Sequence, residues 1–179
     1  MRLAVICSVV AFAASACAAP PAPVPEPPPP STAVRDSLRS AFDSASNYVT
    51  QAAEQVPEAR YSYRPTPEVR TLGELVAHIA QANTMICGAS SGQPAPEAPA
   101  AEAPTKADIQ KALADSVAFC QAAFDAVDDT AGGEPVRLFD AIDSTRLAAL
   151  AFNTAHLMEH YGNIVTYMRI NKMVPPSSM

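Results

Sequence analysis

The sequence is poor in positive charge. Its 179 residues include 12 Lys and Arg against 18 Asp and Glu, which gives a formal net charge of −6 at pH 7. No cluster of basic residues, and no interleaving of basic with aromatic residues, occurs along the chain. Proteins that bind nucleic acid neutralise its phosphates with Lys and Arg. We therefore expect no nucleic-acid partner.

Glycine and strand-forming patterns are also scarce. The chain has six Gly and no Trp, and it lacks a Gly-rich phosphate loop and the G-x-S-x-G pattern of a serine nucleophile. Alanine is abundant instead, and apolar residues recur at intervals of three and four, which is the period of an amphipathic helix. These features predict an all-α protein and argue against phosphate-loop or serine-hydrolase chemistry.

The N-terminus is typical of an export signal. A short positive start is followed by a largely apolar run of twelve residues from Leu3 to Ala14, which is too short to span a bilayer, and small residues come next. Two cleavage sites are open: ASAC resembles a bacterial lipobox, in which Cys17 becomes the lipidated first residue, whereas ACA suits ordinary signal peptidase. We take 1–18 as the signal peptide and expect a bacterial protein that is periplasmic or lipid-anchored in the cell envelope.

Residues 19–30, APPAPVPEPPPP, form a proline-rich linker. Proline fixes φ and lacks an N–H donor, so this segment favours polyproline II geometry. Directly after a lipidated cysteine, such a tether would hold the following domain, 31–178, away from a membrane. Contact with a membrane is therefore expected only through a lipid anchor.

Four helical stretches in this domain predict an up-down four-helix bundle. Thr71 and Glu74 have the spacing of a capping box at the start of the second stretch. A low-complexity loop at 88–104 is long for a compact bundle, and a later loop carries Gly132 and Pro135. The predicted helices span about 32–55, 71–87, 105–127 and 144–171.

Two cysteines lie in the predicted domain, Cys87 and Cys120. In an oxidising compartment an even pair of cysteines tends to form a disulfide, although the sequence does not show that their Cα atoms come within bonding range. The alternative is a pair of buried free thiols. We favour the disulfide.

Two of the three histidines stand four residues apart, His156 and His160, in the stretch NTAHLMEHYG. Side chains at i and i+4 meet on one face of a helix, at a spacing that suits two imidazole ligands of one ion. The third, His78, lies beside the apolar stripe of another predicted helix, from which a bundle could bring it across. Three protein ligands with one open position make a catalytic type of metal site.

Polar neighbours of the histidine pair are candidates to support the ligands. Asn153, Asn163 and Tyr167 fall on roughly the same side of the helix, and Glu159 is either a supporting carboxylate or a solvent-facing one. The stretch also matches the H-x-x-E-H pattern of the inverzincin proteases, with Glu159 as general base. Those proteases take a further acidic ligand downstream, and 161–179 contains no Asp or Glu, so we reject that interpretation.

The chain resembles the DinB-like (DNA-damage-inducible) family in two stretches, LGELVAHIAQAN and NTAHLMEHYGNIVTYMRINKMVPPSS. The first carries the early helix histidine, and the second carries the HxxxH pair followed by YGN and PPSS. The resemblance covers about 31–178 and implies a DinB/YfiT-like four-helix bundle in which His78, His156 and His160 hold a divalent metal, usually zinc or nickel. Some relatives transfer or isomerise groups with a low-molecular-weight thiol. The export signal argues against a thiol-dependent reaction here, because those thiols are cytoplasmic.

The sequence thus predicts an exported metal-dependent hydrolase or group transferase that acts on an unknown small molecule. The alternative is a non-catalytic metal-binding or structural bundle of the cell envelope. Bundles of this kind often dimerise through helix faces, so a homodimer is compatible with the sequence.

Overall fold

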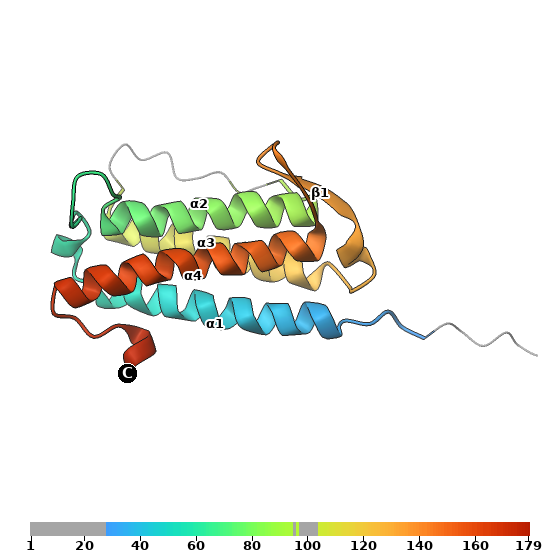
Figure 1. Ribbon diagram of the computed structural model, residues 1–179, viewed down its shortest axis with the longest axis horizontal. Helices are drawn as coiled ribbons and strands as arrows, with labels where there is room; N and C mark the ends of the chain where they lie inside the picture. The colour runs from blue at the N-terminus through green and yellow to red at the C-terminus, as the bar shows by residue number, and fades with distance from the viewer. Residues whose placement is uncertain (1–27, 95, 97–103) are drawn as a thin grey trace, which may run out of the picture.

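The computed structural model of the protein describes residues 28–94, 96 and 104–179. Four long helices pack side by side (Figure 1), and the predicted all-α four-helix bundle is confirmed. No helix within these described ranges is long and apolar enough to cross a bilayer. The long helices are α1 (Ala33–Gln55), α2 (Leu72–Ser91), α3 (Lys106–Asp125) and α4 (Arg146–Ile170), and the short 3-10 helices are η1 (Glu58–Arg60), η2 (Ala131–Gly133) and η3 (Pro176–Ser178).

Three sequence-based expectations fall wholly or partly outside the described residues. These are the signal peptide at 1–18 with its Cys17, the proline-rich linker at 19–30, of which 28–30 are described, and part of the loop at 88–104. The export signal and the lipidation site therefore stay predictions.

Helices α2 and α3 begin with capping boxes. At the start of α2, the N–H of Glu74 donates to Thr71 Oγ1 over 3.2 Å, and the N–H of Thr71 donates to the Glu74 carboxylate over 2.7 Å. Thr105 and Asp108 make the same reciprocal pair at α3. Each box satisfies N–H groups that have no partner within the helix. His78 then falls in the second turn of α2.

The direction of α3 differs from the strict alternation expected of an up-down bundle. Helix α3 runs parallel to α2, because Asn83 lies beside Ser116 and Cys87 lies beside Cys120, while α1 and α4 run the opposite way (Figure 1). The fourteen residues between α2 and α3 reach about 45 Å when extended, and α2 is about 30 Å long. The long loop therefore serves as a crossover connection.

A β-hairpin occupies part of the connection between α3 and α4, where the sequence analysis predicted a loop. Strand β1 (Pro135–Leu138) pairs antiparallel with β2 (Ile142–Thr145). Leu138 is buried against α2 and α4 in a small cluster with Ala82 and Ala149, so the hairpin is anchored on the bundle. The strands have four residues each and their turn lacks the Asn-Gly or Asp-Gly signal, which explains why the pattern did not predict them.

The main core is one cluster of apolar side chains drawn from all four helices. Phe42 of α1 packs on Phe124 of α3 with ring centroids 5.5 Å apart, and Tyr48 of α1 stacks on Tyr161 of α4 at 5.4 Å. Along α1, Val34 is exposed and full burial starts at Phe42.

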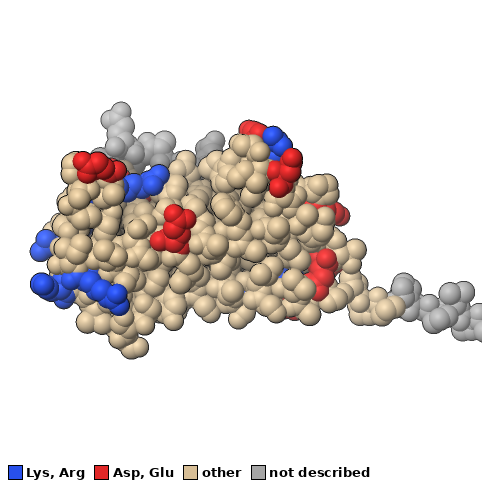
Figure 2. Space-filling model, viewed as in Figure 1, with Lys and Arg blue, Asp and Glu red and all other residues tan. Residues whose placement is uncertain are grey.

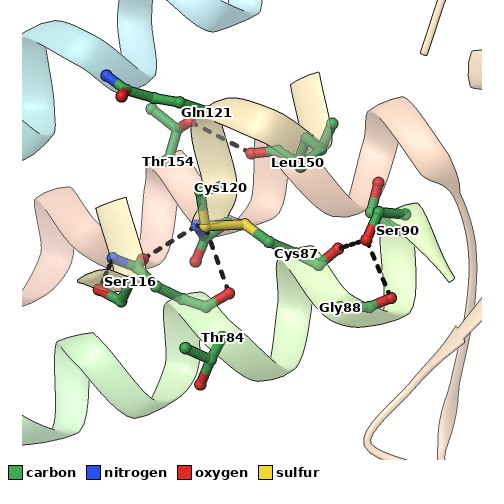
Figure 3. The surroundings of a disulfide bond; sticks show 12 residues. Thr84, Cys87, Gly88, Ser90, Ser116, Cys120, Gln121, Leu150 and Thr154 are labelled. Atoms are coloured by element: carbon green, nitrogen blue, oxygen red, sulfur yellow. Dashed lines mark hydrogen bonds between the residues drawn. A yellow bond between two sulfur atoms is a disulfide. The ribbon is translucent and has the colours of Figure 1, made fainter. Parts of the chain in front are cut away.

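Cys87 and Cys120 are joined as the predicted disulfide between α2 and α3, with Cα atoms 5.2 Å apart (Figure 3). The amide nitrogen of Asn153 on α4 lies 3.4 Å from each sulfur atom and donates to Asn83 Oδ1 over 3.0 Å. Asn83 in turn donates to Ser116 over 3.1 Å. All five side chains are buried, so this cluster links α2, α3 and α4 inside the bundle.

Reduction of the disulfide is expected to destabilise the fold. The bond spans a sequence separation of 33 residues, and a closed loop of that length stabilises a protein by about 3–4 kcal/mol through the unfolded state. Urea unfolding with and without reductant measures the difference. A Cys87→Ala, Cys120→Ala double variant is the control, since its unfolding should not respond to reductant. Reactive thiols at these two positions in the untreated, denatured protein would contradict the disulfide.

Helix α4 ends in a Schellman motif with lysine at the position that favours glycine. The N–H of Met173 donates to Met168 O over 2.9 Å, and the N–H of Lys172 donates to Arg169 O over 3.0 Å. Lys172 has a φ of 61°. This left-handed conformation is unfavourable for a residue with a Cβ atom, whereas glycine adopts it freely.

We expect Lys172→Gly to raise the free energy of unfolding by about 0.5–1 kcal/mol, because relief of the left-handed strain outweighs the greater freedom of glycine in the unfolded chain. Lys172→Ala is the matched control: it removes the same charge but keeps the Cβ atom, so it should bring no gain. Urea unfolding of the three proteins tests this. If the Ala variant is as stable as the Gly variant, the backbone explanation is wrong.

Candidate metal centre

The three histidines of the chain converge between α2 and α4. Each offers one nitrogen atom, and these three atoms all lie within 4.8 Å of one another. The ring centroids are 4.4 Å apart for His156 and His160, 4.8 Å for His78 and His160, and 5.3 Å for His78 and His156. The grouping that the sequence analysis predicted is therefore present in the fold.

Two hydrogen bonds from α4, one to α2 and one to the residue before the N-cap of α2, bracket this cluster. On one side of it, Asn153 donates to Asn83 over 3.0 Å. On the other side, the Tyr167 hydroxyl donates to the backbone carbonyl of Arg70 over 3.0 Å. His78 lies between Arg70, which precedes α2, and Asn83 in the chain, and the histidine pair lies between the two anchoring side chains of α4. The bonds therefore set the register of the antiparallel helices that brings the imidazoles together.

The geometry fits one metal ion after a small adjustment. His156 Nε2 and His160 Nε2 face each other at 3.0 Å. In a tetrahedral site, two nitrogen ligands with bonds of about 2.0–2.1 Å to zinc lie about 3.3–3.4 Å apart, so the facing pair is close to that spacing. The three nitrogen atoms lie within 4.8 Å of one another, and an approach of about 1.5 Å would bring the widest pair to the tetrahedral spacing.

The imidazoles are held in the neutral form that a metal ligand requires. Burial, and after it the neighbouring imidazoles of His156 and His78, lower the pKa of His160 to about 4. Burial likewise lowers the pKa of His78 and of His156, against the opposing charge of Glu159. All three rings are therefore uncharged at neutral pH, and protons do not compete with a cation there.

Two ring nitrogens that face away from the centre have no hydrogen-bond partner among the described residues. In the part of the chain that the structure describes, Nδ1 of His156 and Nδ1 of His160 are buried without a hydrogen-bond partner. A neutral imidazole whose Nε2 is free to bind a metal carries its proton on Nδ1, and metal-binding histidines usually donate that proton to a carboxylate, a carbonyl or water.

The four residues expected to support the ligands do not hydrogen-bond to the histidines. Asn153 contacts the disulfide, and Tyr167 bonds to the start of α2. Glu159 and Asn163 are exposed. Asn153 and Tyr167 thus act on the helix register, and Glu159 acts on the imidazoles through its charge alone.

Two neighbours of the cluster were missed in the sequence. The ring centroid of Phe152, one turn before His156 on α4, lies 6.3 Å from the His156 ring, and its i−4 spacing was a usable signal. Arg70 lies near enough for its charge to lower the pKa of all three histidines. A groove of about 460 Å³ between α2 and α3 also has Arg70 and His78 in its lining.

Comparison with known proteins gives consistent likenesses. Residues 41–164 match the family model described as the DinB superfamily. A DinB-like protein from Bacillus subtilis is 22% identical with a TM-score of 0.64, over 77% of this chain and 93% of that chain. A DinB-like protein from Bacillus cereus is 15% identical with a TM-score of 0.69, over 79% and 95%.

A third solved structure, a mycothiol-dependent maleylpyruvate isomerase, is 15% identical with a TM-score of 0.60. The match covers 73% of this chain and 60% of that chain. At these identities the structures share the fold. No curated protein matches the sequence.

The lowered histidine pKa values predict acid sensitivity of the metal-free protein. Unfolded histidines bind protons below about pH 6.5, whereas folded His160 stays neutral down to about pH 4. Stability should therefore fall as the pH drops through this window. His160→Gln should flatten the decline by up to about 1.4 kcal/mol per pH unit. Urea unfolding in chelator measures it, with Asn163→Ala as control; parallel curves for wild type and His160→Gln would contradict the assignment.

Proposed function

The chain belongs to the DinB superfamily, and from this premise and the converging histidines we propose that it is a metal-dependent enzyme. His78, His156 and His160 would hold a divalent ion, with zinc or nickel the best candidates. The observation that carries the proposal is the pair of Nε2 atoms on α4 that face each other at 3.0 Å, with His78 of α2 beside them. Few ligands other than a metal ion could bind all three neutral imidazoles at once in this arrangement.

The reaction class that fits is hydrolysis or group transfer on a small molecule. A divalent ion with three protein ligands keeps a position open and supplies Lewis acidity. The histidines themselves bind and orient, because their lowered pKa values keep them as neutral imidazoles at neutral pH and not as acidic imidazolium groups. Glu159, exposed and close enough for its charge to act on all three rings, is the carboxylate available to accept a proton at the centre.

Thiol-dependent isomerisation is known in the fold through the mycothiol-dependent maleylpyruvate isomerase. We favour a reaction without a thiol for this chain. The proposed signal at 1–18 would export the protein to the periplasm, or to the envelope with a lipid on Cys17. The buried Cys87–Cys120 disulfide supports such a location, because disulfides persist in oxidising compartments.

A non-catalytic metal-binding bundle is the second candidate. It is favoured by the unsupported Nδ1 atoms of His156 and His160. Within the described residues, no acid or base is hydrogen-bonded to the imidazoles, and a general acid–base catalyst has to lie within such reach of the atoms that react. Turnover that disappears in His78→Ala, with the fold kept, would separate the enzyme from this alternative.

Metal analysis of protein purified without a histidine tag tests the centre. Wild type should carry about one zinc or nickel per chain, and His156→Ala, His160→Ala should carry almost none, because removing two of three ligands abolishes chelation. Met158→Ala is the control, since Met158 is exposed on the same helix. Equal metal content in wild type and the double variant would rule the proposal out.

A further inference from the structure

Two exposed phenylalanines form a wall that ends at the histidine cluster. Phe152 of α4 has its ring centroid 6.3 Å from that of His156, at an interplanar angle of 31°. Phe139, in the turn of the β-hairpin, meets Phe152 edge-on with centroids 6.5 Å apart. The two side chains are 45% and 42% exposed, so a continuous aromatic surface open to solvent leads to His156.

The hairpin holds Phe139 in a fixed place. Leu138, the residue before it, is buried against Ala82, Ile86 and Ala149, which ties the turn to both α2 and α4. The base of the hairpin is joined to the start of α4 by the N–H of Arg146, which donates to the carbonyl of Glu134 over 3.0 Å. The aromatic wall is therefore built from an anchored element.

Neither burial nor turn preference explains a phenylalanine at position 139. Phe139 and the next residue, Asp140, have φ values of 53° and 54°. Turns with two positive φ values favour Asn, Asp and Gly, and a bulky side chain is unfavourable in this conformation. The side chain also leaves much of its surface in water. Contact with a bound ligand would account for both features.

We propose that Phe139 and Phe152 form a subsite for an aromatic or other flat apolar group of a small molecule whose neighbouring heteroatom binds the metal. The inference rests on the proposed metal centre. Because the Phe152 ring lies 6.3 Å from the His156 ring, a group that extends from an ion bound by His156 toward the N-terminal end of α4 would contact Phe152, since aromatic rings interact over about 4.5–7 Å. On the face in Figure 2, one acidic group lies near the middle and the other charged side chains lie toward the margins.

The groove between α2 and α3 is a weaker candidate for the same role. Of the three histidines only His78 lines it, and the facing Nε2 atoms belong to His156 and His160. Its lining is also polar at both ends, with Arg70 and Glu74 at one and Asp115 and Ser116 further along. The aromatic wall is the surface in direct continuity with the pair of ligands on α4.

A pair of hydroxamates tests the subsite. Acetohydroxamate and benzohydroxamate share a metal-chelating head and differ in a phenyl ring. The preference is the Kd for acetohydroxamate divided by the Kd for benzohydroxamate. Isothermal titration calorimetry of the zinc-loaded full chain should give a larger preference than the same titration of free zinc ions. Phe152→Ala and Phe139→Ala should each reduce the preference by about twofold to tenfold, the contribution of one aromatic contact. Met158→Ala, which removes an exposed apolar side chain elsewhere on α4, should leave it unchanged.

The outcomes separate this inference from the metal centre. If acetohydroxamate binds and the preference is the same in wild type and both phenylalanine variants, the subsite is wrong and the metal centre stands. If wild type binds neither zinc nor nickel, both proposals fall. Zinc content and circular dichroism are measured for every variant. If Phe152→Ala loses zinc because its contact with His156 is removed, the preferences measured for Phe139→Ala and Phe152→Leu test the subsite instead.

Discussion

The packing of α2 against α4 is the constraint on which the candidate centre depends. Two side chains of α4, Asn153 and Tyr167, bond to Asn83 of α2 and to Arg70 just before α2, and they fix how far one helix is displaced along the other. A displacement by one turn, about 5.4 Å, would move His78 out of reach of the histidine pair. The ligand geometry is therefore a property of the helix register, and the core residues that bring the helices together serve the site as well as the fold.

In this arrangement the backbone positions of the ligands are fixed more strictly than the orientations of their imidazole rings. The backbone positions of the ligands are set by long helices, yet Nδ1 of His156 and of His160 has no partner within the described chain. Metal sites that hold a strict geometry usually lock each imidazole from behind. Here the rings are oriented by packing and by one another, which leaves room for the small movement that closes the group around an ion. DinB superfamily membership establishes the fold, while chemistry has to be argued from these side chains.

The sequence predicted those features of the fold and the site that depend on the spacing of residues close together in the chain. The four helices, the capping boxes and the histidine pair follow from periods of three and four residues and from short cap motifs. The partnership with His78 was predicted because three histidines leave few alternatives. The hairpin was missed because its strands are short and its turn places Phe139 in a left-handed conformation that phenylalanine does not signal. The parallel course of α3 was missed because loop length bounds a connection without giving its direction, and Asn153 was assigned to the histidines because helical periodicity does not show which neighbour a polar side chain faces.

The disulfide has a further consequence for the connection between α2 and α3. Cys87 precedes the crossover and Cys120 follows it, so the bond joins the two halves of the chain on either side of that segment. A cut by a protease anywhere between Gly92 and Thr105 would leave both fragments covalently attached. Insertions there, and deletions that leave at least about nine residues to span the length of α2, would likewise leave the attachment of α3 to α2 intact. The crossover is thus the part of the domain whose length and sequence can vary most without cost to the metal ligands, which lie on α2 and α4.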